Sequence, residues 1–357
     1  MTTMHRRILA LATAVAFLGV SAGVAAATEL PELKVKAIGL NSKTIASFGD
    51  EVPFWNETIP AASGGQITAE FAPIDLAGIK DPQIMRMTTL GVTDFGAGDI
   101  SKMAGDDPVF EGCDLAGLAL DIETARAACE AWAPVMGRVM EEKFNTKLLA
   151  LGANPPQVFW CRDALAGLGD LAGRKIRVFN KTMADFINAV GGTTISMPFA
   201  EVVPALQRGV VDCAVTGTLS GNTAGWPEVT DYLYPMYLGW SVNYQSVNLD
   251  AWNGFAPEVQ AFFSEQFDRF EDKMWQTAGK AVDDAEHCNF GKQPCEMGKM
   301  AEMTLVPIGD ADRAKHKELM QDVVLVEWAK RCGKDCAAEW NGTVGEVVGL
   351  QIPLDKL

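Results

Sequence analysis

The chain has 357 residues, of which 48% are hydrophobic, and its 46 acidic residues outnumber its 30 basic ones for a formal net charge of -16. Such an acidic protein is repelled by the phosphate backbone, so we exclude nucleic acid as a partner. A chain of this length predicts two globular lobes, each able to bury a core of its own.

Residues 1–27 have the features of a secretory signal peptide. Arg6 and Arg7 precede an apolar run, Ile8–Val20, and a stretch of small residues follows it. We expect cleavage at the end of this segment and a periplasmic location for the mature protein. The apolar run is too short to span a bilayer comfortably, and no later stretch is apolar for long enough. The mature protein is therefore not expected to insert into a membrane directly.

Strands and helices alternate along most of the chain, which predicts an α/β fold with open, largely parallel sheets. Paired glycines and polar residues mark the ends of the elements. The elements expected in chain order are a strand over 32–40, a helix over 52–65, a strand over 66–74, strands over 146–153, 158–161 and 175–179, a helix over 182–192 and a strand over 193–199.

A weak internal repeat appears between residues 84–101 and 202–220. Each copy reads as an amphipathic helix, a Gly-Val-x-Asp turn and a short apolar strand ending in Gly and small polar residues. The repeat favours two similar lobes. Ligands of such sheets bind outside the carboxyl ends of the strands, so we expect the ligand in a cleft between the lobes.

A long helix is predicted over about 257–287, where apolar residues recur at helical spacing without a breaker. Periodicity alone is consistent with a helix that braces both lobes and with a surface helix packed on one of them. The residues that carry the pattern are Val259, Phe262, Phe263, Phe267, Phe270 and Met274.

Eight cysteines in an exported chain predict disulfide bonds rather than metal ligands. Sequence alone does not fix their connectivity, and a zinc site built from the four C-terminal cysteines is the alternative, although their spacing fits no finger or ribbon pattern. No cofactor and no other metal is expected. The expected pairs are Cys113–Cys129, Cys161–Cys213, Cys288–Cys295 and Cys332–Cys336.

Three blocks carry a resemblance to a known family. They are DLAGRKIRVFN at Asp170–Asn180, the stretch Asn188–Gly217, and WPEVTDYLYP at Trp226–Pro235, followed by the predicted long helix. With these blocks, nearly the whole mature chain resembles the solute-binding proteins of tripartite ATP-independent periplasmic (TRAP) transporters, of the DctP type. The resemblance implies a two-lobed periplasmic binding protein fold with a ligand cleft and a long bracing helix.

The resemblance also implies how the chain is divided. Lobe I is expected over residues 28–151 plus about 240–268, and lobe II over 152–239 plus about 290–357. The long helix over about 257–287 would span both.

The family implies that an arginine at the end of the KIRV strand grips the carboxylate of an organic acid, and that position is Arg177 here. A guanidinium matches a carboxylate in two parallel hydrogen bonds, and a strand's carboxyl end would project it into the cleft. Arg174 and Lys175 are expected to face solvent. Two positions depart from the family pattern: Phe179 replaces the usual Pro, and Cys213 replaces a Gly.

Other candidate binding residues come from the strand after residue 152 and from the segment after residue 216. Arg162 is a second candidate carboxylate ligand, although pairing with Asp163 or Asp170 is at least as well supported. The tryptophans would stack on a flat ligand or belong to the core, and with Phe179 they favour an aromatic or bulky carboxylate. The full set is Gln157, Trp160, Arg162, Phe179, Thr218, Asn222 and Trp226, together with Arg177.

We therefore expect a non-catalytic receptor that closes over an organic acid and delivers it to the membrane permease subunits of a TRAP transporter. A periplasmic enzyme acting on organic acids is the alternative. It lacks recognisable parts, because the chain has no Gly-x-Ser-x-Gly elbow, no phosphate loop and no His-rich metal pattern. A sensor subunit is a third possibility that sequence does not separate from transport.

Overall fold

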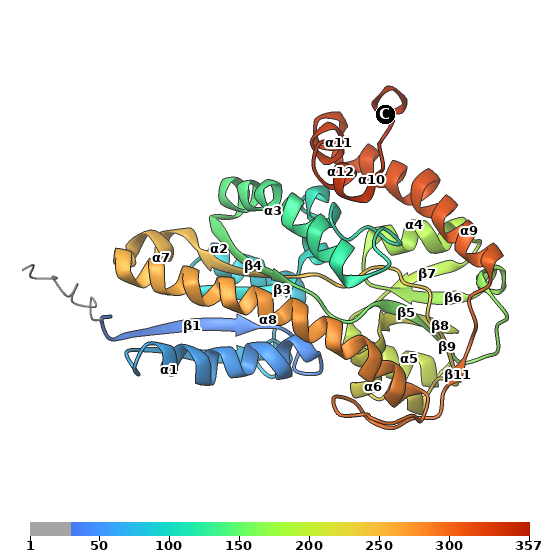
Figure 1. Ribbon diagram of the computed structural model, residues 1–357, viewed down its shortest axis with the longest axis horizontal. Helices are drawn as coiled ribbons and strands as arrows, with labels where there is room; N and C mark the ends of the chain where they lie inside the picture. Colours follow the sequence, from blue (N-terminus) through green and yellow to red (C-terminus); the bar gives the residue numbers. More distant parts are fainter. Residues whose placement is uncertain (1–29) are drawn as a thin grey trace, which may run out of the picture.

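The computed structural model describes residues 30–357 and shows two β-sheets with helices packed around them (Figure 1). The predicted signal peptide, residues 1–27, lies outside the described residues. Within residues 30–357, no helix is both long enough and apolar enough to cross a membrane.

The first sheet, which we call sheet A, has the strand order β2-β1-β3-β10-β4. Strands β1, β2 and β3 run parallel, whereas β10 is antiparallel to both of its neighbours. The bounds are β1 Leu33–Gly39, β2 Ile67–Pro73, β3 Phe95–Asp99, β4 Thr146–Gly152 and β10 Asn243–Asn248.

The second sheet, sheet B, has the order β11-β9-β5-β8-β6-β7. Strand β6 is parallel to β7 and β8, while β5 is antiparallel to β8 and β9. The bounds are β5 Gln157–Cys161, β6 Lys175–Val178, β7 Thr193–Ser196, β8 Cys213–Gly217, β9 Tyr232–Tyr234 and β11 Thr304–Leu305.

The expected α/β fold with two lobes is confirmed, but the sheets are more mixed than the expected, largely parallel ones. The antiparallel pairs all involve β5 or β10, which are entered by the connectors that pass between the sheets, β4 to β5 and β9 to β10. The chain reaches β5 and β10 from the other lobe. Each of these strands is therefore antiparallel to its neighbours in the sheet. The sequence pattern of alternating strands and helices does not report this reversal.

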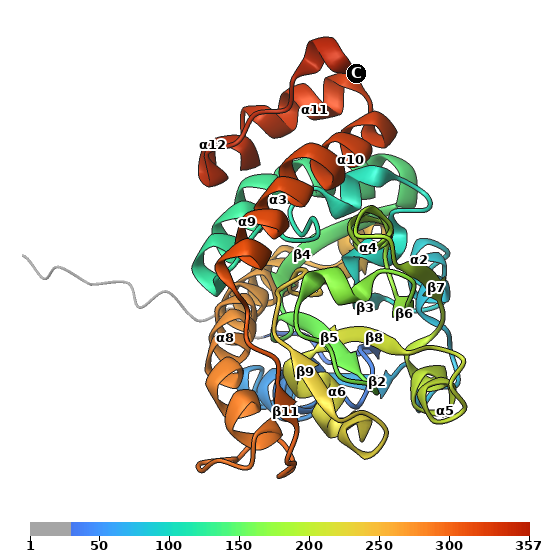
Figure 2. The same cartoon turned by 90° about the vertical axis from the view of Figure 1, so that its right-hand side faces the viewer.

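Helices cover both faces of the sheets, and the C-terminal ones gather over α3 (Figures 1 and 2). Two π-helical turns, Ala46–Glu51 and Phe54–Thr58, lead into α1. The α-helices are α1 Ile59–Ala62, α2 Asp81–Thr89, α3 Ile122–Phe144, α4 Lys181–Ala189, α5 Val202–Gln207, α6 Thr218–Thr223, α7 Leu249–Gly254, α8 Pro257–Asn289, α9 Asp310–Leu319, α10 Leu325–Cys332, α11 Lys334–Asn341 and α12 Val344–Val348.

The internal repeat corresponds to α2–β3 in one lobe and α5–β8 in the other. Gly91 and Gly209 follow the two helices with left-handed φ of 65° and 69°, a conformation that favours glycine. The next amide bonds back in the same way each time, from Val92 to the Met87 carbonyl and from Val210 to the Ala205 carbonyl, both at 2.9 Å. The same turn therefore directs β3 and β8 toward the middle of the molecule.

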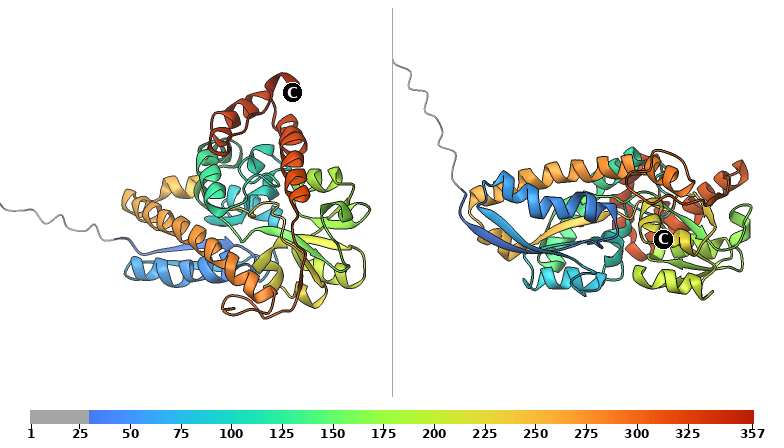
Figure 3. Two further views of the ribbon diagram at one scale, coloured as in Figure 1. Left: turned by 45° about the vertical axis from the view of Figure 1, so that its right-hand side comes forward. Right: turned by 90° about the horizontal axis from the view of Figure 1, so that it is seen from below.

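The long helix α8 runs along both lobes (Figure 3, right). Its first half buries phenylalanines against sheet A, where Phe267 packs with Phe54 and Phe95 at ring-centroid distances of 5.0 and 5.9 Å. Its last turns carry alanines instead, and Ala281 and Ala285 pack with Leu219 of α6 in the other lobe. Large residues fill the space above a sheet, whereas small ones allow two helices to approach closely.

All eight cysteines are paired as expected from the sequence, in Cys113–Cys129, Cys161–Cys213, Cys288–Cys295 and Cys332–Cys336. Cys161 and Cys213 lie directly opposite each other on β5 and β8. The four C-terminal cysteines form two separate disulfides, so the alternative of a zinc site built from them does not hold.

Candidate functional site

A cavity of about 100 Å³ lies where the carboxyl ends of strands from both sheets meet. We call it the central cavity. Its walls come from the ends of β1, β3, β6 and β8, from the N-terminus of α2 and from the two connectors between the lobes. The lining residues are Leu40, Asn41, Thr44, Asp81, Asp99, Lys102, Asn154, Gln157, Arg177, Phe179, Pro198, Phe199, Thr216, Ser220, Ser241 and Asn243.

Arg177 lies on β6, and its side chain is only 2% exposed. The Nε and Nη2 atoms donate to the Met197 carbonyl at 3.2 and 3.1 Å, and Nη1 donates to the Val215 carbonyl at 2.8 Å. Neighbouring strands therefore hold the guanidinium by backbone groups, which have no charge to neutralise it.

Two N–H groups of Arg177 remain available for a ligand. A guanidinium has five N–H donors, and three of them are used, so one is left on each terminal nitrogen. No carboxylate among the described residues forms an ion pair with this arginine within 4.0 Å. Burial lowers the pKa of Arg177 to about 10, and Asp81 and Asp99 only partly oppose this effect. Arg177 is therefore a buried cation whose two remaining N–H groups can donate to an anion.

A second cation, Lys102, reaches the cavity from the other lobe. Its Nζ atom donates to the carbonyl of Phe179 at 2.9 Å and lies 4.7 Å from the centre of the Phe179 ring. The Arg177 guanidinium lies 5.3 Å from the same ring. Burial lowers the pKa of Lys102, and the negative charge of Asp99 only partly offsets this effect. Phe179, which stands where the family pattern has Pro, is thus in contact with both cations.

Two aspartates lie on the same side of the cavity as Lys102. Asp99, at the end of β3, accepts bonds from the backbone and hydroxyl of Ser101 at 2.9 and 2.5 Å and from the Ser241 hydroxyl at 2.6 Å. Asp81 is the first residue of α2, where the helix dipole favours a negative charge. Burial raises the pKa of Asp81, and the charge of Lys102 opposes this.

The connectors between the lobes supply the neutral polar wall. Asn154 and Gln157 lie on the β4–β5 connector and at the start of β5, and Ser241 and Asn243 lie on the β9–β10 connector and at the start of β10. The backbone N–H of Asn154 donates to the Trp240 carbonyl at 2.9 Å, and this bond joins the two connectors. This wall therefore belongs to the two segments that connect the lobes.

The structure places three of the candidate binding residues in the central cavity, Gln157, Arg177 and Phe179. Trp160 and Trp226 do not line it. Both are fully buried in the core beneath sheet B, with their rings packed edge to face at 6.0 Å. Trp160 shares the Arg177 face of sheet B, because both residues pair with Ala214, but Trp226 and Gly221 of α6 cover its ring. Phe199 stacks on Trp226 at 5.6 Å, so neither tryptophan is available to stack on a ligand.

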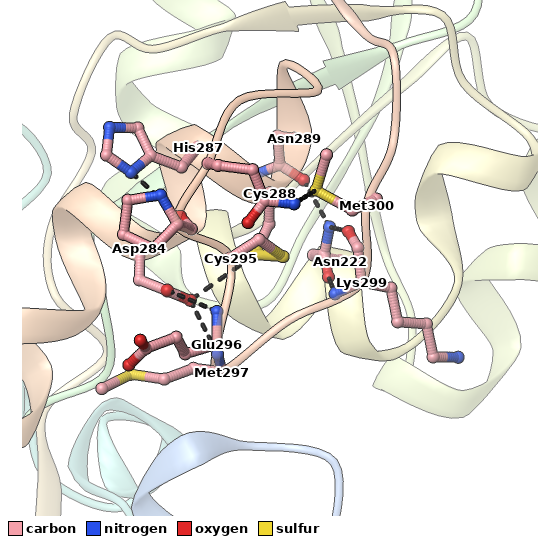
Figure 4. The surroundings of a disulfide bond; sticks show 12 residues. Asn222, Asp284, His287, Cys288, Asn289, Cys295, Glu296, Met297, Lys299 and Met300 are labelled. Carbon is pink, nitrogen blue, oxygen red and sulfur yellow. Dashed lines mark hydrogen bonds between the residues drawn. A yellow bond between two sulfur atoms is a disulfide. The ribbon is translucent and has the colours of Figure 1, made fainter.

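Arg162, Thr218 and Asn222 also lie outside the lining of this cavity. Asn222 is buried, and its amide is fully used, because it bonds Asn289 at 2.8 Å and both the carbonyl and the amide of Lys299, at 2.8 and 2.6 Å. Figure 4 shows these bonds beside the Cys288–Cys295 disulfide. Asn222 therefore fastens the loop after α8 to α6.

Sequence reasoning missed Lys102, Asp81, Asp99 and the asparagines of the connectors. A usable signal was present for Asp99, because it ends the strand of the first repeat copy, where a carboxyl end faces the cleft. Lys102 lies in a 3₁₀ turn, Ile100–Met103, directly after β3, and Asp81 is the first residue of α2. The direction of both side chains depends on how the lobes pack against each other. Their place in the site could not be inferred from spacing.

A family model agrees with this architecture. The model for DctP, bacterial extracellular solute-binding protein family 7, matches residues 41–330. The chain belongs to this family. Its members are solute-binding receptors rather than enzymes, as expected from the sequence.

Solved structures of similar fold include other receptors. This DctP-family chain superposes with a TM-score of 0.77 and 18% identity on an extracytoplasmic solute receptor of Bordetella pertussis binding pyroglutamic acid, covering 89% of this chain and 99% of that one. A TRAP solute-binding protein of Haemophilus influenzae with bound L-gulonate gives a TM-score of 0.75 at 21% identity, covering 88% and 99%. At these identities the likeness shows the fold.

A curated relative is also known by sequence. The DctP-family chain is 28% identical over 177 residues to an uncharacterised protein of Haemophilus influenzae. That stretch is 49% of this chain and spans about half of the relative, 53% of its length.

Proposed function

We propose that this protein is the extracytoplasmic receptor of a TRAP transporter and captures an organic carboxylate by closing its two lobes around it. Arg177 carries the proposal, because it is a buried cation with two unpaired N–H groups and it lines the central cavity. Leaving a buried charge unpaired is costly, and a carboxylate that accepts both bonds removes that cost.

The binding energy available from this clamp is substantial. Hydrogen bonds to charged groups contribute about 1.5 to 3 kcal/mol each, and a micromolar complex needs about 8 kcal/mol. A bidentate contact with Arg177 would therefore supply a large part, and contacts with the polar wall and Phe179 the remainder.

The cavity favours a polar acid over an aromatic one. An aromatic or bulky ligand was expected from Trp160, Trp226 and Phe179, but only Phe179 lines the cavity. Most of the other residues that line it are polar or charged. Proteins of similar fold have been solved with pyroglutamic acid, orotic acid, succinate, L-gulonate and β-D-galacturonate.

The lobes are already joined across the cavity in this structure. Lys102 of one lobe bonds the Phe179 carbonyl of the other, and the Thr223 hydroxyl bonds the Lys43 carbonyl at 2.7 Å. A ligand that bridges Lys102 and Arg177 would add a further link between the lobes and shift an open–closed equilibrium toward the closed form. The closed form would then be delivered to the membrane permease subunits.

The test of the clamp is calorimetric titration of the mature protein, stripped of ligand by partial unfolding and dialysis, with pyroglutamate, orotate, L-gulonate, D-galacturonate and succinate. We expect at least one acid to bind, Arg177→Ala to lose at least a hundredfold in affinity, and Arg177→Lys to recover little of it, because the planar fork is lost. Arg208→Ala, at an exposed arginine outside the cavity, is the control. Unchanged binding by Arg177→Ala would refute the clamp.

The delivery step has its own test. Proteoliposomes that contain TRAP permease subunits from the same genome should take up the bound acid only when this receptor is added. Uptake of equal rate without the receptor would contradict the transport part of the proposal and leave the binding part intact.

A further inference from the structure

The central cavity has equal numbers of positive and negative side chains on its wall. Arg177 and Lys102 are the cations, and Asp81 and Asp99 are the carboxylates. A ligand with one carboxylate adds one negative charge to this balanced set, whereas a dicarboxylate adds two. Each uncompensated charge in a site shielded from water is costly, so the balance disfavours the second carboxylate.

The two aspartates are not neutralised by direct ion pairs with the cations, since no pair between them lies within 4.0 Å. Three donors from Ser101 and Ser241 orient the Asp99 carboxylate and stabilise its charge. The Asp81 carboxylate receives no hydrogen bond from another described residue. Asp81 is exposed and lines the cavity, so water solvates its carboxylate until a donor group of the ligand takes the place of that water.

Two amide groups on the connectors are also incomplete. The Oδ1 atom of Asn154 and the Nδ2 atom of Asn243 are buried and have no hydrogen-bond partner among the described residues. The Nδ2 atom of Asn154 donates to the Ser241 carbonyl, which fixes Oδ1 as the acceptor. Leaving a buried polar atom without a hydrogen-bond partner is costly, so a ligand that bonds either atom would bind more tightly.

These unpaired groups distinguish ligand classes. An ionised dicarboxylate without hydroxyl or N–H groups, such as succinate, has only acceptors, so it has nothing to donate to Asn154 Oδ1 or to Asp81. A hydroxyl or an N–H group can donate to either, and a hydroxyl can also accept from Asn243 Nδ2. The wall therefore requires donors on the part of the ligand away from Arg177.

We propose that Asp81, Asp99 and Asn154 make the receptor selective for a monocarboxylate that carries hydroxyl or N–H donors and exclude dicarboxylates. This selectivity rests on the carboxylate receptor proposed above. Arg177 binds the single carboxylate, Lys102 lies nearby from the other lobe, and the acidic wall accepts from the donors. Asp81 acts as the specificity residue because it lines the cavity and no cation of the described residues forms an ion pair with its carboxylate.

The test uses ligand pairs that differ in one group. D-Gluconate and D-glucarate differ only in a terminal hydroxyl or carboxylate, and 4-hydroxybutanoate and succinate differ in the same way. Calorimetric titration of the stripped mature protein at pH 7.5 should give at least tenfold tighter binding of the hydroxy acid in one or both pairs. Equal or tighter binding of the dicarboxylates, or no binding by any of the four, would overturn the proposal.

A substitution assigns the effect to the wall. Asp81→Asn keeps the shape and removes the charge, and we expect it to lower the preference for the hydroxy acid at least fivefold by admitting the dicarboxylate. The matched control is Asp310→Asn, because Asp310 is likewise an exposed first residue of a helix, α9, but does not line the cavity. An unchanged preference in Asp81→Asn would refute the role of Asp81.

The result remains separable from the proposed function. If Arg177→Ala binds the hydroxy acids as the unaltered protein does, the clamp fails while the preference still reports on the acidic wall. If the clamp holds and dicarboxylates bind equally well, only the selectivity fails. Thermal unfolding of each ligand-free variant checks that the substitution has left the fold intact.

Discussion

At the scale of single residues, Phe179 is the side chain that connects the two cations of the site. Its ring lies within cation–π distance of Lys102 and Arg177, and its carbonyl accepts a bond from Lys102. Each cation–π contact contributes about 0.5 to 2 kcal/mol. The ring thus helps to hold both cations in position before a ligand arrives.

We predict that Phe179→Leu weakens binding of a carboxylate ligand about three- to tenfold, because the carbonyl bond remains and only the ring contacts are lost. Calorimetric titration measures the change. Phe199→Leu is the control, since Phe199 also lines the cavity but stacks on Trp226 at 5.6 Å rather than on a cation. Equal losses in the two variants would mean that both rings merely fill space.

Residues of the site were predictable where a local rule fixes their direction. Arg177 and Gln157 lie on strands that point at the cleft, so strand ends and family resemblance indicated them. Trp160 shares a face of sheet B with Arg177, yet Trp226 and α6 cover its ring, and a single sequence does not report which segments pack over a strand. Lys102 was missed because its contact with Phe179 joins residues 77 positions apart.

At the scale of elements, α8 shows how far periodicity reaches. A helix was expected over about 257–287, and it spans Pro257–Asn289. What the pattern does not show is the partner on each half, because phenylalanines at helical spacing pack equally well on a sheet or on helices. The change from Phe to Ala along the helix becomes interpretable only once sheet A and α6 are seen beneath it.

The aromatic half of α8 should carry much of the stability of its lobe. We predict that Phe267→Ala lowers the free energy of unfolding by about 3 to 5 kcal/mol, because the ring is 1% exposed and its removal leaves a cavity among Phe54, Trp55 and Phe95. Urea denaturation measures the loss. Phe48→Ala, at a phenylalanine that is 38% exposed, should cost far less. A loss below about 1 kcal/mol in Phe267→Ala would contradict this packing.

At the scale of the whole molecule, buried carboxyl groups join segments that are distant in sequence. Glu51 accepts from the Leu40 amide at 2.6 Å and from Gln245 at 3.3 Å. Asp114 accepts from the amides of Trp240 and Val242 on the β9–β10 connector, at 2.8 and 3.3 Å. Burial raises the pKa of each of these carboxyls to about 7.

Glu111 and Glu271 share this behaviour. Glu111 accepts from the amides that begin α4, and Glu271 accepts from Leu151 of β4 at 3.1 Å. Burial raises the pKa of both to about 7 as well. Folding therefore places four carboxyl groups where protonation is easier than in the unfolded chain, and this makes the stability of the whole molecule depend on pH.

The sign follows from proton binding. An unfolded Glu titrates near 4.5 and an unfolded Asp near 3.8, so between those values and about pH 7 the folded protein binds more protons than the unfolded chain. Stability must then fall as pH rises through this range and level off above the folded pKa. Burial lowers the pKa of His316, which acts in the opposite sense only below its ordinary value of 6.5.

We therefore predict that the free energy of unfolding decreases from pH 6.5 to 8.5, because the four carboxyls together outweigh the opposite contribution of the single His316 at the lower end of this window. Urea denaturation across this window measures the slope. Glu51→Gln should lower the slope by about a quarter, because one of the four carboxyls is removed while the amide can keep the bond from Leu40. Glu57→Gln, at an exposed position nearby, should leave the slope unchanged. A stability that rises with pH across the window would show that these carboxyls are ionised at little cost in the folded protein, and the buried network would then stabilise their charged forms.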